Sequence, residues 1–303
     1  MAISRGQLVK ELEPGLNALF GLEYKRYENQ HAEIYTTESS DRAFEEEVML
    51  SGFAQAQTKS EGAGVVFDNA QETYTARYTH ETVALAFSIT EEAIEDNLYD
   101  RLASRYTKAL ARSMANTKQV KAVAPLINGL PTNDAFDSGD GVSLFNTAHP
   151  TIAGTVKNTL TTQADLNETS LEQCLIDIAA MTDERGLKIA ARGVKMIVPS
   201  ELQFTAERLM KSQGRVGTAD NDINAIVSMG MVPQGYRVNN FLTDTDAYYI
   251  ITDVPNGMKY FDRASIKTSM EGDFDTGNVR YKARERYSFG VSDFRGIFGV
   301  EGA

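Results

Sequence analysis

Three histidines and a single cysteine are the residues whose chemistry most readily serves catalysis or metal binding. His149, directly before Pro150, could act as a general base, but no recognisable nucleophile or orienting acid accompanies it. A hydrogen-bonding role in a loop is therefore the favoured interpretation. Cys174 falls on the apolar face of an expected helix, which predicts a buried and inert thiol. The sequence predicts no catalytic residue.

Two further patterns match ligand-binding motifs only in part. Asp134, Asp137 and Asp140 look like the start of a calcium loop, yet their spacing is wrong and the bidentate glutamate is missing. The glycines at Gly62 and Gly64 lack the third glycine and the strand–helix setting of a dinucleotide fingerprint, so they indicate a turn. So few histidines and cysteines nearly exclude zinc and iron–sulfur sites. We therefore expect no metal and no cofactor.

The composition narrows the class of protein. The 303 residues are 42% hydrophobic and 24% charged, which is typical of a globular protein. A net charge of −12 argues against simple nucleic-acid binding, which requires a basic surface. There is no apolar run long enough for a membrane span and no signal-peptide core at the start. We expect a soluble protein of about two domains, with an accessible surface of about 12,600 Å² if it is compact.

The first 35 residues indicate an arm rather than a domain. Short apolar pieces between residues 7 and 20 predict an amphipathic turn or two, interrupted near Pro14. Such a segment has too few apolar residues to form a core by itself. We expect it to lie on another surface.

Residues 44–89 have the alternating pattern of β-strands. The apolar positions change parity at His80, which predicts a bulge or a strong bend there. A polar tip from Gln55 to Gly64 and a return that begins at residues 65–67 predict a long hairpin. A tip with so few large apolar groups needs a partner to cover it.

The strongest helix signal starts after Thr90, a capping residue. An apolar stripe at helical spacing continues without glycine or proline as far as Pro125, and Gly129 follows. We expect these two residues to end the helix. The pattern predicts a spine helix over residues 90–124, about 50 Å long.

The second half of the chain alternates strands with helices. A turn-rich loop at 129–168 leads to a capped helix, and a turn at 255–257 predicts a hairpin between the strands on either side of it. The other expected elements are a strand at 194–198, a helix at 200–214, and strands at 236–238, 247–252, 258–261 and 265–270. This alternation indicates an α/β or α+β subdomain.

The closing strand, residues 279–291, has two different faces. Tyr281, Tyr287 and Phe289 point to one side, which predicts a buried face. The basic residues of the other face are Arg280, Lys282, Arg284 and Arg286. Like charges two residues apart repel one another, so we expect these side chains to have carboxylate partners.

The order of these parts resembles the major capsid (head) protein of tailed double-stranded-DNA bacteriophages, with its Hong Kong 97-type fold. The stretches from Phe145 to Pro150 and from Tyr281 to Gly290 are similar to the Mu-like major head subunit branch of that family. Neither stretch is a catalytic signature, so the resemblance rests on their combination and order. It implies an α+β fold and a structural, self-assembling protein rather than an enzyme.

The resemblance also implies a division of the chain. In the family, axial domains surround five- and six-fold axes, while the arm and the extended loop clasp neighbouring subunits. The segments that correspond here are an N-terminal arm at 1–40, an extended loop at 41–88, a peripheral domain at 89–186 with the spine helix at 90–124, an axial domain at 187–262, and a return to the peripheral domain at 263–303.

The implied partners are further copies of the chain. Hexamers and pentamers would form an icosahedral head shell around double-stranded DNA, without sequence-specific binding. The chain shows no scaffolding segment, so a separate scaffold or earlier removal of that segment is implied, together with a portal and a decoration protein. Assembly in the host bacterial cytoplasm and a final place in the virion follow from the resemblance.

Six residues are candidates for contacts between subunits. Some family members cross-link lysine to asparagine, and Lys59 lies at the hairpin tip, but no partner is identifiable and a solvated lysine is favoured. For Arg284 and Arg286, pairing within the sheet and pairing with a neighbour's acids both remain open. The acids of that second explanation are Glu45, Glu46 and Glu47.

Two other functions compete with a capsid subunit. An encapsulin-like compartment shell shares the fold and would enclose protein cargo instead of DNA. An enzyme of unrecognised type would need an acidic site near His149, and substitution of this histidine by alanine would then abolish turnover.

Overall fold

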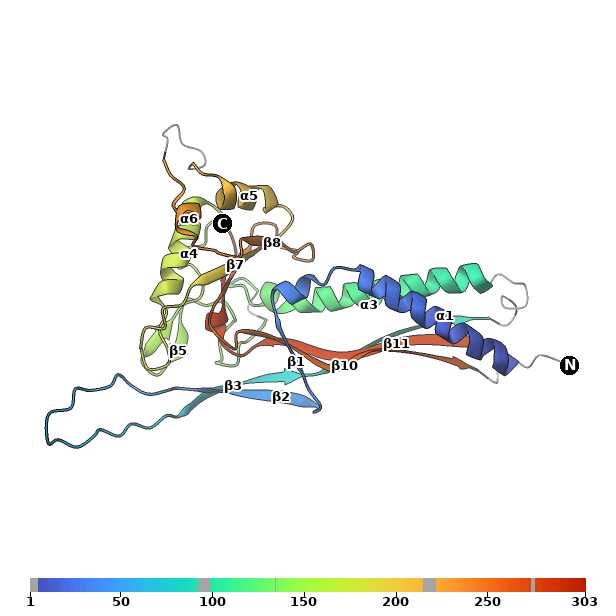
Figure 1. Ribbon diagram of the computed structural model, residues 1–303, viewed down its shortest axis with the longest axis horizontal. Helices are drawn as coiled ribbons and strands as arrows, with labels where there is room; N and C mark the ends of the chain where they lie inside the picture. Colours follow the sequence, from blue (N-terminus) through green and yellow to red (C-terminus); the bar gives the residue numbers. More distant parts are fainter. Residues whose placement is uncertain (1–4, 91, 93–98, 134, 215–221, 274–275) are drawn as a thin grey trace.

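The computed structural model describes residues 5–90, 92, 99–133, 135–214, 222–273 and 276–303. The molecule is elongated: a compact unit lies at one end of a long wing, and a hairpin projects beneath both (Figure 1). Its accessible surface is 16962 Å². A compact monomer of this size would expose about 12,600 Å², so the chain is more extended than a compact monomer.

Two helices and a four-stranded sheet form the wing. Helix α1 (Arg5–Arg26) and helix α3 (Tyr99–Asn128) lie side by side on one face of the sheet (Figure 1). The strand order is β1-β10-β11-β4. The strands are β1 (Thr36–Ser39), β10 (Met258–Gly272), β11 (Val279–Val291) and β4 (Glu81–Ile89), and a short 3-10 helix, η1 (Gln30–Glu33), precedes β1.

Helix α1 is continuous through Pro14, so the predicted interruption is wrong. A proline inside a helix costs about 3 kcal/mol. Leu16 and Phe20 are buried against Met114 of α3 and Tyr281 of β11. Burial of a large apolar side chain contributes about 1.5–3 kcal/mol, so these two contacts offset the cost. The described part of the expected arm therefore packs on its own chain.

The spine helix differs from the prediction at its end. Its predicted start adjoins residues 91 and 93–98, which lie outside the described residues. Helix α3 continues past residue 124 to Asn128 and includes Pro125. Leu126 and Leu130 are buried in the main core beyond the proline. Their packing outweighs the single backbone hydrogen bond that Pro125 removes.

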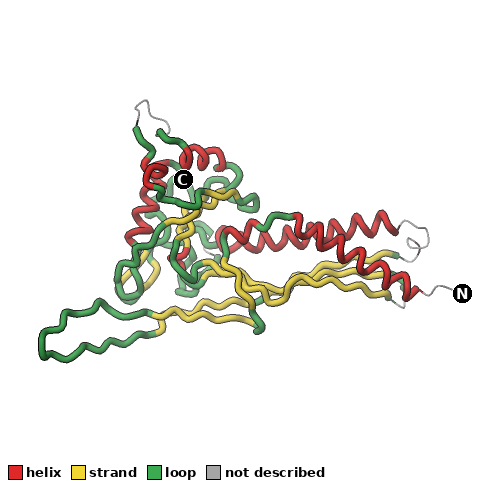
Figure 2. The backbone as a smooth tube through the Cα atoms, viewed as in Figure 1, coloured by secondary structure: helices red, strands yellow, loops and turns green. Residues whose placement is uncertain are grey.

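The hairpin consists of β2 (Phe44–Leu50) and β3 (Glu72–Thr79), joined by a long loop (Figure 2). The expected return strand at 65–67 is wrong, because these residues are in that loop. The bend at His80 is confirmed: Thr79 pairs with Phe44 in the hairpin, whereas Glu81 pairs with Tyr287 in the wing.

A second four-stranded sheet, with the order β12-β9-β7-β8, forms the centre of the compact unit. The unit contains β5 (His149–Thr151), β6 (Gly154–Val156), α4 (Glu168–Ala180), β7 (Gly193–Val198), α5 (Gln203–Lys211), α6 (Ala225–Met229), β8 (Tyr236–Val238), β9 (Tyr248–Thr252), η2 (Phe294–Gly296) and β12 (Ile297–Val300). Helix α4 packs through Leu175 and Ile178 on Gly193, and β12 pairs with β9. Helix α4 and strand β12 therefore contact the part of the chain that was expected to form the axial domain, residues 187–262.

The hairpin predicted around residues 255–257 is wrong. Strand β9 lies in the compact unit and β10 lies in the wing, so the turn joins two sheets. Gly257 approaches Gly296 so closely that a Cβ on Gly257 would lie 2.7 Å from the Cα of Gly296. This backbone contact explains why glycine is required at the junction.

Candidate functional site

His149, the residue with the clearest catalytic chemistry, is completely closed off from solvent. Its Nδ1 lies 2.6 Å from Oδ2 of Asp140, and its Nε2 lies 3.0 Å from Oδ1 of Asn158. The ring stacks on Phe294 with the centroids 3.8 Å apart. Burial opposes ionisation of Asp140, but hydrogen bonds from His149 and Ser138 hold the pKa of this carboxyl below its usual range. The arrangement joins two loops and leaves no approach for a substrate.

Asn158 is a structural residue that the sequence interpretation missed. Its Nδ2 donates to the carbonyls of Leu144 and Phe294 at 2.7 and 3.1 Å, and its Oδ1 accepts from the backbone N–H of Asn146 at 2.9 Å. Nothing in its own neighbourhood of the sequence identifies it, because two of these partners come from other loops. Asn158 and His149 together tie the loop at 144–149 to the C-terminal residues.

Cys174 is buried beside Tyr248, as the apolar helix face predicted. Burial raises the pKa of its thiol to about 12, so it is not a reactive nucleophile. Among the described residues, no group of His, Cys, Asp or Glu side chains could hold a metal ion. In the same part of the chain, no helix is long and apolar enough to cross a membrane.

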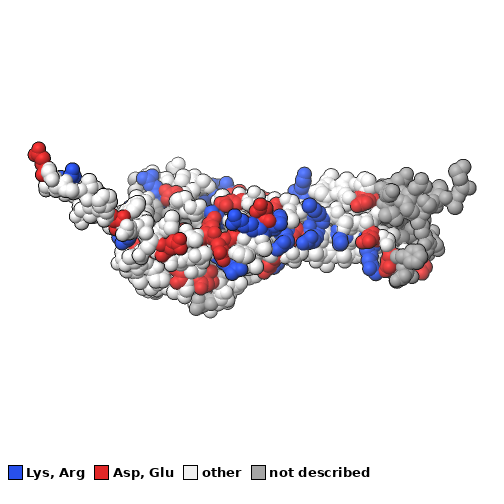
Figure 3. Space-filling model, turned by 90° about the horizontal axis from the view of Figure 1, so that it is seen from below, with Lys and Arg blue, Asp and Glu red and all other residues white. Residues whose placement is uncertain are grey.

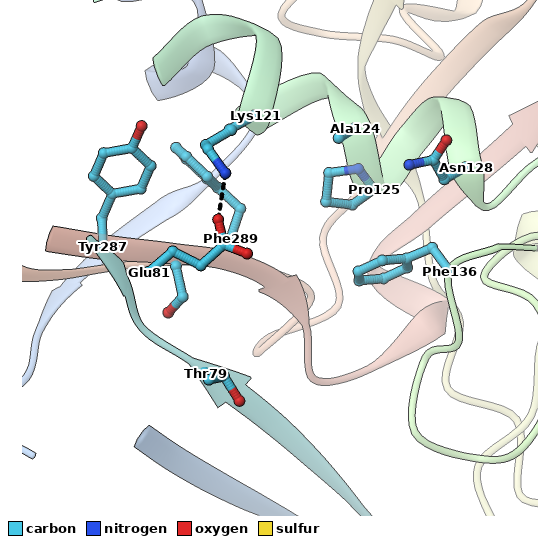
Figure 4. A pocket seen from close by; sticks show the side chains of 10 residues that line it. Thr79, Glu81, Lys121, Ala124, Pro125, Asn128, Phe136, Tyr287 and Phe289 are labelled. Atoms are coloured by element: carbon cyan, nitrogen blue, oxygen red, sulfur yellow. Dashed lines mark hydrogen bonds and ion pairs between the residues drawn. The ribbon is translucent and has the colours of Figure 1, made fainter. Parts of the chain in front are cut away.

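A cavity of about 180 Å³ lies where the hairpin, helix α3 and the sheet of the wing meet (Figure 4). Pro125 and Phe136 lie on one side of it, and an ion pair between Lys121 and Glu81 lies on the other. The ion pair joins α3 to the first residue of β4. This cavity therefore marks a structural joint.

Most of the large apolar side chains of the hairpin are exposed to solvent. Phe67 is 92% exposed, the highest value among the large hydrophobic residues described. Others in the same segment are Phe44, Val48, Leu50, Phe53, Val65 and Val66. A concentration of exposed apolar residues on one projecting element marks a protein interaction surface.

The base of the hairpin is fixed to the body by close contacts. Tyr74 donates to the carbonyl of Ser292 at 3.3 Å, and the hydroxyl of Tyr78 bonds to the hydroxyl of the same serine. A Cβ on Gly290 would lie 2.6 Å from the ring of Tyr78, so only glycine fits beneath that ring. These contacts hold the base while the distal loop projects away from the body (Figure 1).

The three predicted glutamates of the hairpin have different surroundings. Glu45 accepts a hydrogen bond from Ser40 at 2.7 Å, and Glu47 pairs with the buried Lys259. Glu46 is on the outer face, 3.7 Å from Arg77, and both side chains are largely exposed. Of the three, Glu46 is the one most accessible to another subunit.

The basic residues of β11 face away from the helices. Arg280 pairs with Asp273, while Lys267 of β10 stands directly opposite Arg284 in the sheet register. Like charges directly opposite each other are destabilising. Figure 3 shows Lys and Arg side chains gathered midway along this side of the molecule. We call this surface, formed by Lys267, Lys282, Arg284 and Arg286, the basic face.

The two arginines predicted as contacts lie at this face, and Lys59 is exposed in the distal loop of the hairpin. Within the described residues, neither arginine forms an ion pair with the chain's own acids. Glu285 between them points to the opposite side, where Tyr24 donates to it at 3.0 Å and Lys118 pairs with it. Burial raises the pKa of Glu285.

Three of the solved structures that resemble this chain are described as capsids or a virus-like particle. The capsid of an empty GTA particle has a TM-score of 0.58 at 12% identity, covering 90% of this chain and 89% of that chain. The capsid of Cyanophage P-SCSP1u has a TM-score of 0.55 at 12% identity, covering 89% and 86%. A virus-like particle from Pyrococcus furiosus has a TM-score of 0.51 at 10% identity, covering 94% and 98%. These likenesses show the Hong Kong 97-type fold.

The sequence itself then identifies the family. The family model described as phage capsid protein matches residues 73–300, which is most of the chain. The chain belongs to the phage capsid protein family, and it is a structural major capsid protein rather than an enzyme. Comparison with curated proteins gave no match.

Proposed function

We propose that the chain assembles into hexamers and pentamers of an icosahedral head shell that encloses double-stranded DNA. The projecting apolar hairpin carries this proposal. Phe67, Val65 and Val66 are each at least 65% exposed on an element that does not fold back on the body. Coverage by a neighbouring subunit removes this apolar surface from water.

The two parts of the molecule have separate roles in this proposal. The compact unit is the axial domain, which surrounds the symmetry axes, and the wing is the peripheral domain, which connects capsomers. The hairpin at 44–79 reaches the next subunit. The resemblance noted in the sequence supports this division, as does the separation of the two sheets in the structure.

In this proposal, the charged residues predicted as contacts form one specific interaction between subunits. Arg284 and Arg286 of one subunit face Glu46 of its neighbour, because Glu46 is the most exposed of the three glutamates and its one partner, Arg77, is itself exposed. The charges of the basic face that repel one another in the isolated chain then gain an acidic partner. Lys59 remains a solvated residue of the hairpin loop.

Further partners complete the shell. They are a separate scaffold, a portal and a decoration protein, and assembly takes place in the host bacterial cytoplasm. Within the family, the similarity of the stretches at 145–150 and 281–290 supports a position in the Mu-like branch. The enclosed DNA is held without sequence-specific contacts, which agrees with the net charge of −12.

Electron microscopy and light scattering of the purified protein, with and without its scaffold, test this proposal. We expect closed shells or capsomers of five and six subunits. Particles formed in cells should contain nuclease-protected DNA; protein cargo in its place would identify a compartment shell. A monomer at every concentration, with scaffold present, would refute the proposal.

A further inference from the structure

A cavity of about 650 Å³ opens on the compact unit. It lies between helix α4, the segment that leads into β7, and the end of α6. Its lining is mainly apolar and includes Leu175, Ala179, Val194, Met229 and Met231. Methionine side chains adapt readily to an inserted group.

The rim of this cavity has the features of an unfilled contact surface. Met229 is 70% exposed there, and nearby Ile176 is 60% exposed. Ala190, also in the lining, has a φ of 52°, which is strained for a residue with a side chain. Arg192 and Asp253 add one charge of each sign. Oδ1 of Asp253 accepts a hydrogen bond from the backbone N–H of Arg192 at 2.8 Å, and among the described residues neither side chain forms an ion pair.

Helix α5 carries a group that fits such a cavity. Phe204 is 70% exposed on this helix. Glu201 lies three residues before it, in the turn that precedes α5, and Arg208 lies one helical turn after it; both are exposed. Their hydrogen bonds are local, to Ser200 and Thr205 respectively. The segment at 201–208 therefore presents an aromatic side chain between an acid and a base.

We propose that Phe204 of one copy inserts into this cavity on the next copy. Arg208 then faces Asp253, and Glu201 faces Arg192, so each charge meets the opposite sign. The inference rests on the proposed self-assembly and names its contact between compact units. A second copy is the occupant because one chain carries both the aromatic group and a cavity with complementary charges.

The positions of the two surfaces agree with a ring. Figure 1 shows α4 on the left of the compact unit and α5 at its upper right. A contact that joins two different patches of identical subunits is heterologous, and it closes into a ring when the rotation permits. Every subunit then uses its Phe204 on one side and its cavity on the other.

The first test replaces the aromatic group. Phe204→Asp should raise the dissociation constant for association of the subunits about tenfold or more, as measured by sedimentation velocity of the full chain. The reason is that buried aromatic anchors dominate interface energies. Circular dichroism should be unchanged, since the side chain is exposed. Lys211→Glu is the matched control, because Lys211 is exposed on the same helix and pairs with Glu207 in its own chain. We expect it to assemble normally.

The second test exchanges the charges. Arg208→Glu and Asp253→Arg should each reduce assembly, and the two together should restore it. If Phe204→Asp assembles like the wild type, the cavity contact is wrong while the proposed function stands. If the wild type never assembles, the proposed function itself fails.

A cross-link identifies the occupant directly. The native Cys174 is buried, so the pair Phe204→Cys and Ala179→Cys supplies the reactive thiols. Oxidation of assembled protein should give a ladder of disulfide-linked chains, and either single variant should give none. A monomer without links would overturn the proposal. Protection of the Phe204→Cys thiol from maleimide after scaffold is added, with no disulfide-linked ladder in the double variant, would assign the partner of Phe204 to the scaffold instead.

Discussion

At the scale of single residues, each of the three histidines is buried and each is satisfied in a different way. His31 accepts a hydrogen bond at Nδ1 from Gln119, which lies 2.9 Å away, and its ring packs against Tyr260 and Phe289. His80 contacts two serine hydroxyls, and His149 lies between Asp140 and Asn158. Their shared role is to join segments distant in sequence.

The first prediction concerns acid stability. Burial, together with the charge of Lys118, lowers the pKa of His31 to about 4. Between pH 6.5 and 4 the unfolded chain protonates this histidine and the folded chain does not, so stability falls as pH falls. We expect His31 to account for about 3 kcal/mol of this loss by pH 4.

Urea unfolding of unassembled wild type and His31→Gln from pH 7.5 to 4 measures this contribution. The wild type should lose its stability advantage over the variant as the pH falls. The variant leaves His149 and its buried contacts unchanged, so the difference between the two proteins reports on His31. Parallel curves for the two proteins would show that His31 titrates normally.

At the scale of elements, the hairpin has a fixed base and an uncovered end. Strands β2 and β3 pair in register from Phe44 opposite Thr79, and tyrosines of β3 anchor them to the body. The loop from 51 to 71 contributes little to the core, with Ser51 its buried member. Apart from the contacts of Arg185 with Asp68 and with the carbonyl of Asn69, the loop therefore adds little to the stability of the body.

The second prediction is that deletion of residues 55–64 leaves the subunit folded and blocks or weakens the shell. Circular dichroism and thermal unfolding should match the wild type, because these residues are exposed. Electron microscopy should show few or no closed particles. Phe67→Ser provides a milder variant, with a smaller loss of particles. Normal particle yield from the deletion would exclude a role of the hairpin tip between subunits.

At the scale of the whole molecule, shape and charge both indicate an incomplete unit. The accessible surface of 16962 Å² exceeds the value for a compact monomer by about a third. The net charge is −12, yet the basic face concentrates four cations on one side of the wing. Contact between identical copies covers the excess apolar surface and gives the segregated charges partners of the opposite sign.

The third prediction uses charge reversal to test the contact between the basic face of one subunit and Glu46 of its neighbour. Arg286→Glu should reduce assembly while leaving the circular dichroism of the monomer intact, and Glu46→Lys in the same chain should partly restore it. Sedimentation velocity measures both. Lys25→Glu, an exposed reversal on α1, is the control and should assemble normally. An unfolded Arg286→Glu subunit, or normal assembly, would show that the basic face serves the subunit's own fold.

Periodicity along the chain was enough to predict several elements, whereas the family follows from a resemblance in the order of the parts and in two short stretches of sequence. The two faces of β11 follow from its alternation, because a strand exposes every second side chain, and the structure buries Tyr281 and Tyr287 accordingly. The long spine helix follows from its apolar stripe, and the bend at His80 follows from the change of parity. These features depend on local geometry.

Only the tertiary structure decided where locally unfavourable residues are tolerated and which distant groups meet. Pro14 and Pro125 lie inside helices because burial of neighbouring apolar side chains offsets their cost. Strands β9 and β10 separate into two sheets although a hairpin turn joins them, because each finds its partners elsewhere in the chain. Asn158 contacts residues more than a hundred positions away, and no local pattern encodes such a contact.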